Sequence, residues 1–93
     1  MKATINGRRY NSEKCEVLGE KYYYNNGNYS GNCKLLRASD GTLLVCNETN
    51  GQDLYYRDSF TLFSDSSMTI DNFNLDEDQE KRCAELGLIT IVE

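Results

Sequence analysis

The four cysteines, Cys15, Cys33, Cys46 and Cys83, are the side chains best suited to redox, nucleophilic or metal chemistry in this chain of 93 residues. Long stretches of chain separate them, whereas a structural zinc site normally uses close pairs that one tight turn aims at the same ion. The chain contains no His, so a nucleophilic cysteine would lack its usual base. We therefore expect buried free thiols, with disulfides or a metal site as alternatives, and predict no catalytic residue, metal ligand or cofactor.

Acidic residues gather in the last third of the chain and form the first candidate binding surface. Residues 1–64 carry 8 basic and 7 acidic side chains, and residues 65–93 carry 2 basic and 8 acidic ones, which together give the net charge of −5. The acidic candidates are Asp71, Asp76, Glu77, Asp78 and Glu80. They can form a solvated helix face. Alternatively they imitate a phosphate backbone and dock in the basic groove of a nucleic-acid-binding enzyme, with electrostatics steering the encounter.

Tyrosines form the second candidate binding surface, since the chain has seven of them. Tyr22, Tyr23 and Tyr24 are consecutive, and Tyr29 follows shortly after. Because side chains alternate between the faces of a strand, Tyr23 should point away from Tyr22 and Tyr24, and at least one of the three should be exposed. Tyr is enriched in interfaces, which favours a binding surface for a protein or a base. Cross-strand packing in a small aromatic core is the alternative interpretation.

Several function classes lack their usual signals. There is no basic patch to neutralise a series of phosphates, so we expect no direct nucleic-acid binding. No run of apolar residues is long enough to span a membrane, and the first ten residues lack the apolar region of a secretory signal. The sequence also lacks a Gly-rich phosphate loop and a calcium-binding loop. We therefore expect a cytoplasmic protein.

Short strands joined by tight turns must position these side chains over the first two-thirds of the chain. Asn6-Gly7 between residues 3–5 and 8–10 predicts a hairpin, because both turn residues accept positive φ. The pattern then predicts a strand over 15–24, a loop over 25–32, and a hairpin of strands 33–38 and 42–47 around Asp40-Gly41. A further turn is expected at 50–52, and one or two aromatic-rich strands are expected over 53–63.

The pattern becomes helical near the C-terminus. Residues 68–73 could be a short strand or an irregular segment. Asn74 is the expected N-cap of a helix over about 75–86, with acids in its first turn and Gly87 as the residue that ends it. Residues 88–92 are expected to return as a short strand. The predicted fold is therefore α+β and a single domain over 1–93, a small bent antiparallel β-sheet of hairpins with one short C-terminal helix and a final short strand.

Two segments resemble a family of small proteins carried by phages and other mobile elements of gut and related bacteria. Residues 5–13, Ile-Asn-Gly-Arg-Arg-Tyr-Asn-Ser-Glu, and the residues 15–19 that follow look like the family's opening strand, turn, basic-aromatic step and polar run. Residues 35–44 look like its apolar-Arg strand, Gly turn and apolar strand. An acidic helix follows in both. The chain departs from the pattern because it has no Trp, and because Leu43 and Leu44 stand where the family often has aromatics. The resemblance implies a mobile-element origin and assigns no binding residue.

Some small proteins of this kind inhibit bacterial defence systems, and anti-CRISPR proteins are among them. Our hypothesis is therefore a non-enzymatic inhibitor, acting in the bacterial host cytoplasm. It would bind a host defence or nucleic-acid enzyme through the acidic and tyrosine residues. The alternative is a protein that binds or sequesters a signalling nucleotide in an aromatic pocket. Candidate phosphate ligands for that alternative are Arg8, Arg9, Arg37 and Arg57. The free edges of a small sheet also suggest a homodimer.

Overall fold

The computed structural model describes residues 1–49 and 58–92, which form an α+β fold of two antiparallel sheets and one short helix. The expected turn over 50–52, the first part of the expected 53–63 strands, and Arg57 lie outside the described residues. The strands and the α-helix are β1 (Lys2–Ile5), β2 (Arg8–Asn11), β3 (Glu16–Asn25), β4 (Asn28–Arg37), β5 (Leu43–Thr49), β6 (Ser59–Leu62) and α1 (Glu77–Glu85). Three single 3₁₀ turns lie between them, η1 (Ser12–Lys14), η2 (Phe63–Asp65) and η3 (Ile70–Asn72).

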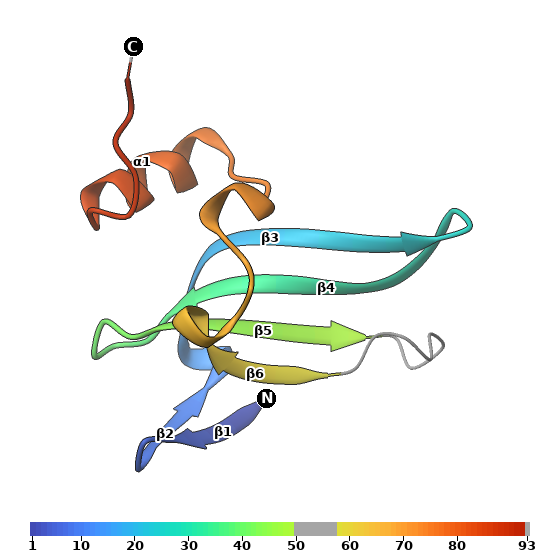
Figure 1. Ribbon diagram of the computed structural model, residues 1–93, viewed down its shortest axis with the longest axis horizontal. Coiled ribbons are helices and arrows are strands. Elements are labelled where there is room, and N and C mark those ends of the chain that lie inside the picture. The colour runs from blue at the N-terminus through green and yellow to red at the C-terminus, as the bar shows by residue number, and fades with distance from the viewer. Residues whose placement is uncertain (50–57, 93) are drawn as a thin grey trace.

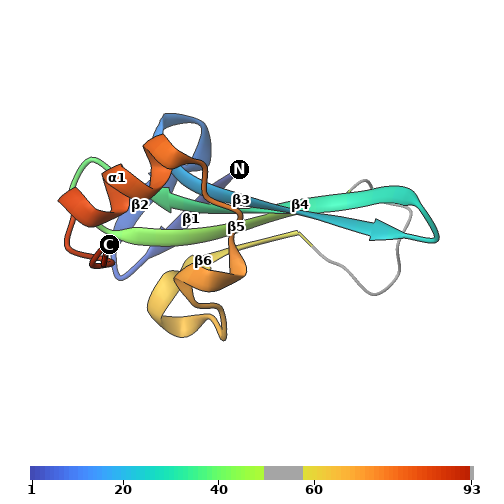
Figure 2. The same ribbon diagram turned by 90° about the horizontal axis from the view of Figure 1, so that it is seen from above.

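The larger sheet is an antiparallel meander with the strand order β3-β4-β5-β6, and β1 and β2 form a separate two-stranded sheet (Figure 1). The predicted single bent sheet is therefore divided in two. The segment after β6 crosses one face of the larger sheet and leads to α1, which packs beside β3 (Figure 1). Figure 2 shows η2 and η3 standing clear of the sheet on one side. The larger sheet is thus the layer on which the other elements pack.

A cluster of buried residues lies on each face of the larger sheet, away from the tip of the β3–β4 hairpin. This explains why its central strands are continuous apolar runs in the sequence. Neighbouring residues on β4 point to opposite faces, so Leu35 and Leu36 belong to different clusters, and both are almost fully buried. Leu36 packs with Leu44 and with residues of the β1–β2 hairpin. Leu35 packs with Val45 and with the C-terminal segment. Two thin cores therefore share one sheet.

The β3–β4 hairpin is longer than the sequence predicted, and the expected loop over 25–32 is wrong. A two-residue turn joins the strands, with φ of 53° at Asn26 and 80° at Gly27. Asn-Gly favours this turn because its twist matches the twist of the strands. The β3–β4 register shifts between Tyr23 and Tyr24, which leaves Ser30 as an extra residue on β4. The end of the hairpin consequently carries Tyr24 and Tyr29 beyond Gly31, where the pairing of β4 with β5 ends.

The C-terminal helix is shorter than predicted, and its N-cap is different. Asp76, and not Asn74, caps α1: the Asp76 Oδ1 atom accepts a hydrogen bond from the Gln79 N–H at 2.8 Å, and the Gln79 Oε1 atom accepts one from the Asp76 N–H at 3.0 Å. Asn74 is used elsewhere, because its N–H donates to the Glu20 carbonyl at 2.9 Å and forms a bridge with β3. The helix ends as expected at Gly87, where φ is 76°.

The final strand over 88–92 is not formed. Leu88 and Ile89 pack on the core without joining a sheet, and Ile91 and Val92 are exposed. Asn74 instead bridges β3 at Glu20, the one residue of that edge which the C-terminal segment pairs. The segment 68–73 is irregular and contains η3, which agrees with one of its two predicted forms.

Asp40 ties the small sheet to the β4–β5 turn. It accepts hydrogen bonds from the Thr42 N–H at 3.0 Å, from Arg8 at 2.7 Å and from the Tyr10 hydroxyl at 3.0 Å. The Thr42 N–H, with help from Arg8, holds the pKa of Asp40 well below its usual range. A lowered folded-state pKa adds stability that is complete above the unfolded pKa of about 3.9 and is lost as the pH falls toward the folded value.

We therefore expect the Asp40→Asn variant to melt at a lower temperature than the wild type at neutral pH. The difference between the two melting temperatures should narrow as the pH falls below about 4, because the wild-type carboxylate is then progressively protonated. Thermal denaturation of both proteins across a pH series checks this. Asp65→Asn, at an exposed carboxylate without such partners among the described residues, is the control and should show no comparable gap. A gap that stays constant down to acidic pH would contradict the prediction.

Candidate interaction surface

Three tyrosines at the far end of the β3–β4 hairpin form an exposed cluster. Tyr22, Tyr24 and Tyr29 are 48%, 64% and 43% exposed. The Tyr29 ring centre lies 6.2 Å from those of both Tyr22 and Tyr24, in tilted and edge-to-face arrangements. Tyr23 belongs to the opposite face, where it packs half-buried against the other core. The predicted alternation along the strand is therefore confirmed, and we call Tyr22, Tyr24 and Tyr29 the tyrosine cluster.

Polar neighbours hold two of these rings in place. The Tyr22 hydroxyl donates to the Glu20 carboxylate, which raises the pKa of Tyr22. The Asn32 amide donates to the Tyr29 hydroxyl at 2.9 Å. Aromatic pairs in this offset geometry add about 0.5–1.5 kcal/mol beyond the area they bury. The tyrosine cluster is thus an ordered surface in which little conformational freedom remains to be lost on binding.

The acidic residues of the C-terminal segment differ in what they already bind. Asp76 is the N-cap of α1, and Glu77 forms an exposed ion pair with Lys81 at 3.7 Å. Asp78 and Glu80 are exposed and lie within ion-pair distance of no Lys or Arg in residues 1–49 and 58–92. Arg82, the nearest basic side chain on α1 after Lys81, is held by Glu16 at 2.8 Å. Asp78 and Glu80 are therefore the carboxylates of α1 that pair with no Lys or Arg of the described residues.

A groove of about 480 Å³ connects the two candidate surfaces. Tyr22 and Glu20 line it from β3, and Leu75, Asp76 and Gln79 line it from the start of α1. The structure thus brings the tyrosine cluster beside the acidic N-terminal end of the helix. Asp71 is not part of this arrangement, because it lies exposed on η3 and does not line the groove.

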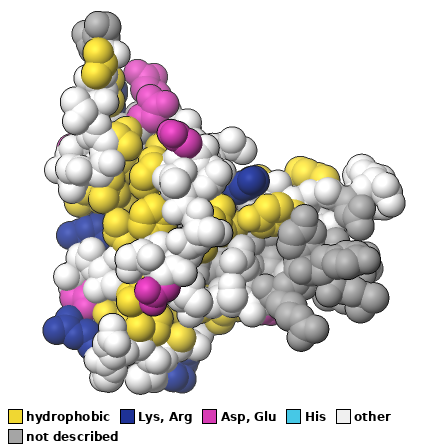
Figure 3. Space-filling view, in the orientation of Figure 1, with side chains coloured by type: hydrophobic (Ala, Val, Ile, Leu, Met, Phe, Trp, Pro, Cys, Tyr) yellow, Lys and Arg dark blue, Asp and Glu magenta, His cyan; other side chains and the backbone are white. Residues whose placement is uncertain are grey.

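The view in Figure 3 shows how charge is divided over one face of the molecule. Acidic side chains near the top lie over the region of α1, while lower on this face acidic side chains lie among Lys and Arg. An ion pair joins Arg8 of β2 to Asp40. The acids over α1 favour a basic partner at that end of the molecule.

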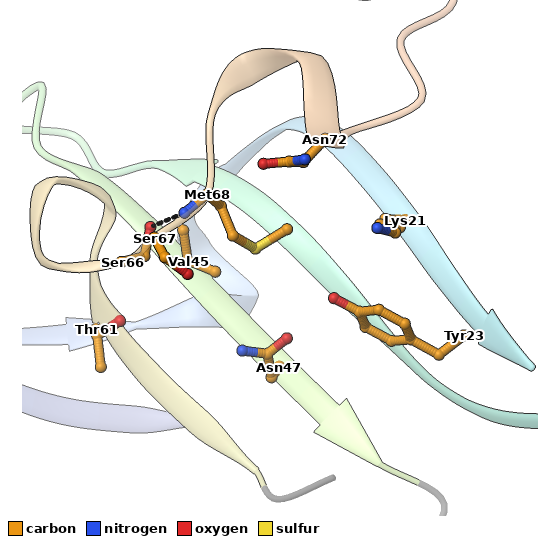
Figure 4. A pocket seen from close by; sticks show the side chains of 9 residues that line it. All are labelled: Lys21, Tyr23, Val45, Asn47, Thr61, Ser66, Ser67, Met68 and Asn72. Carbon is orange, nitrogen blue, oxygen red and sulfur yellow. Dashed lines mark hydrogen bonds between the residues drawn. The ribbon is translucent and has the colours of Figure 1, made fainter.

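A second, polar groove of about 490 Å³ lies on the face that carries η2 and η3, and Tyr23 is the only residue of its lining that the sequence pointed to. Its lining comes from β3, β5, β6 and the segment after η2: Lys21, Tyr23, Val45, Asn47, Thr61, Ser66, Ser67, Met68 and Asn72. Figure 4 shows Tyr23, Asn47 and Met68 pointing toward one another across it. The Lys21 ammonium lies 5.5 Å from the Tyr23 ring centre. One cation surrounded by hydroxyl and amide groups suits a small anionic ligand.

The cysteines serve as core residues in this structure. The predicted burial is confirmed for Cys33, Cys46 and Cys83, while Cys15 is half-buried, and all four are free thiols. Burial raises the pKa of all four thiols, to about 11 for Cys46, where Glu48 adds to the effect. A thiol with a raised pKa is a weak nucleophile at neutral pH. Within the part of the chain that the structure describes, no three His, Cys, Asp or Glu side chains gather as metal ligands.

Comparison with known proteins adds no family to this picture. No protein-family model, no curated protein and no solved structure matches the chain. Among the described helices, none has both the length and the apolar character needed to cross a membrane.

Proposed function

We propose that the chain is a non-enzymatic binding protein of phage or mobile-element origin that inhibits a host defence or nucleic-acid enzyme in the bacterial cytoplasm. It would bind a basic surface of that enzyme through the tyrosine cluster and the free acids of α1. The observation that carries the proposal is one groove that runs from Tyr22 of the tyrosine cluster to Asp76 at the start of α1, the helix that bears the free acids. Rigid aromatic anchors and steering charges can then act on the same partner. A surface with free carboxylates repels DNA and RNA, which supports a protein as the partner.

The proposal is tested by expressing the chain in bacteria that carry a defined defence nuclease and counting phage plaques. Inhibition should restore plaques, and the purified nuclease should bind the purified chain directly. If the chain restored plaques against none of a full panel of defence systems, and bound none of their nucleases, the proposal would be contradicted.

Removing the tyrosine cluster should weaken this binding without unfolding the protein. Because Tyr22 and Tyr24 are exposed, we expect Tyr22→Ser with Tyr24→Ser to raise the dissociation constant by about a hundredfold, as loss of two aromatic anchors usually does. Isothermal titration with the nuclease measures this. Val17→Ala, an apolar truncation at an exposed site earlier on β3, is the matched control and should leave the affinity unchanged. Unchanged affinity in the double variant would remove the tyrosine cluster from the interface.

The polar groove favours a second candidate function, the binding of a small anionic ligand such as a signalling nucleotide. The arginines expected to hold its phosphates do not line this groove: Arg8 is paired with Asp40, and Arg9 donates to Thr4 at 3.1 Å. Lys21 would take their place beside the Tyr23 ring. A thermal-shift screen with nucleotides separates the two functions, since a ligand that prefers the folded state raises the melting temperature. Under this candidate the shift disappears in Lys21→Gln.

A further inference from the structure

The outer edge of β3 is open over its second half. β3 is the first strand of the larger sheet, so one of its edges faces away from β4. Asn74 covers that edge at Glu20, with its N–H donating to the Glu20 carbonyl at 2.9 Å. Beyond Glu20, no backbone group of the described residues pairs with it. Figure 1 shows β3 continuing past the C-terminal segment toward the hairpin turn.

Two independent observations indicate that the backbone N–H and C=O groups of Tyr22 and Tyr24 point outward from this edge. Glu20 uses its carbonyl on the outer side, and along an antiparallel strand every second residue faces the same side, which adds Tyr22 and Tyr24. Independently, the two-residue turn makes Asn25 and Asn28 a hydrogen-bonded pair, so Tyr24 next to it faces outward. The pairing of β3 with β4 has two irregularities: Leu18 is an extra residue on β3, before Glu20, and Ser30 is an extra residue on β4. The alternation along β3 is therefore unbroken from Glu20 to Tyr24.

The open part of this edge has few of the features that normally protect a strand from pairing: its one charged residue is Lys21, and the bulge at Ser30 is on β4 and not on the edge strand. Natural edges carry charged residues or Pro, or are very short. Residues 22–32 contain no charged residue, although 27% of the chain is charged, and the chain has no Pro. With ten residues, β3 and β4 are also the longest strands of the described fold. Such an edge is suited to receive another strand.

We propose that two copies of the chain form a dimer by antiparallel pairing of their β3 edges, with the two-fold axis at Tyr23. The backbone N–H and C=O groups of Tyr22 then form hydrogen bonds with those of the partner's Tyr24. By symmetry, the same groups of Tyr24 bond to those of the partner's Tyr22. Both are hydrogen-bonded pairs, whereas Tyr23 faces the partner's Tyr23 without hydrogen bonds. The two larger sheets become one sheet of eight strands. The tyrosine clusters of both copies lie on one continuous face, because residues paired across strands share a face.

A second copy fits this edge better than an unrelated strand, because the edge is complementary to itself. The same sequence supplies both sides, which a two-fold interface requires. The charges also permit it: α1 lies near the Glu20 end of β3, and antiparallel pairing places that end beside the partner's uncharged Asn26–Gly27 turn. The acidic helices of the two copies therefore stay apart, and like charges do not meet across the axis.

Sedimentation equilibrium of the wild type, at concentrations up to the millimolar range, should show a reversible dimer. Tyr24→Pro removes the outward N–H and leaves the hydrogen bonds to β4 intact, so it should fold and dissociate. We expect its dimer dissociation constant to rise at least about tenfold, since two hydrogen bonds are lost per dimer. Tyr24→Thr, which loses the ring but keeps the N–H, is the control and should remain dimeric. Circular dichroism verifies that both variants are folded.

Cysteine trapping tests the register independently of the proline variant. A Tyr23→Cys pair on the axis would have Cα atoms about 4.5 Å apart, within disulfide range, so mild oxidation should give a covalent dimer. Tyr22→Cys faces the partner's Tyr24 and should not crosslink. A wild type that is monomeric at every concentration, a Tyr24→Pro dimer as tight as the wild type, or equal crosslinking of the two cysteine variants would overturn the proposal. A monomeric chain that still binds a host nuclease would leave the proposed function standing.

Discussion

The Leu35→Ala variant should lose about 3–5 kcal/mol of unfolding free energy, the largest stability effect expected in this protein. Leu35 is fully buried on β4, between Val45 and the C-terminal segment. Truncating it removes apolar contacts and leaves a cavity that the neighbouring strands cannot close. Domains of this size have roughly 5–15 kcal/mol of stability in total, so a large part of it depends on this one side chain. Urea unfolding, followed by circular dichroism, measures the loss.

The matched control is Val17→Ala, an aliphatic truncation on the adjacent strand at a site that is 39% exposed. Less surface is withdrawn from water there, so the expected loss is below about 1 kcal/mol. Leu36→Ala should behave like Leu35→Ala, although Leu36 faces the opposite core. The shared sheet makes both cores unfold together. A Leu35→Ala loss no larger than that of the control would show that the C-terminal segment does not pack on the sheet as described.

The turns of this fold could be predicted from the sequence because their signal is local. Asn6-Gly7 and the region around Gly41 were recognised, and the positive φ at each explains why Gly is needed. The β3–β4 hairpin was missed although Asn26-Gly27 gives the same signal, because Gly31 made the whole stretch resemble a loop. Gly31 is instead within β4, where a Cβ atom would collide with the Glu48 carbonyl oxygen of β5. A tertiary contact with β5 therefore explains why residue 31 is Gly, and no local sequence pattern reveals such a contact.

The C-terminal errors have a similar cause. Asn74 and Asp76 are both good N-cap residues, and the choice between them depends on the β3 edge, which engages the Asn74 backbone. The segment 88–92 is apolar and β-branched, but its first residues, Leu88 and Ile89, pack into the core and do not pair with a strand. Propensity describes what a segment prefers, while the available partners decide what it forms.

The sequence predicted only those features of the candidate site that arise within a single strand or helix. The alternation of Tyr22, Tyr23 and Tyr24 follows from strand geometry, and the exposed acids follow from the helix pattern. The polar groove around Lys21 was out of reach, because its lining is assembled from three strands and a later segment. The groove that joins Tyr22 to Asp76 likewise requires α1 to lie beside β3.

Reversing the free acids of α1 is the change with the largest expected effect on partner binding. Asp76 and Glu77 are poor choices for such a test, because the first caps the helix and the second pairs with Lys81. Losing the cap would cost about 1 kcal/mol of helix stability and confuse the result. Asp78→Lys with Glu80→Lys changes the charge while leaving both of those contacts in place.

We expect this double reversal to raise the dissociation constant for the inhibited nuclease by about a hundredfold at low salt, mainly through slower association. The effect should shrink as salt is added, because exposed charges are screened. Glu13→Lys with Asp65→Lys is the matched control: it changes the net charge equally at exposed sites away from α1. If the control weakened binding as much as the reversal, net charge alone would explain the attraction. A hundredfold loss confined to the α1 variant would place the partner's basic surface against Asp78 and Glu80.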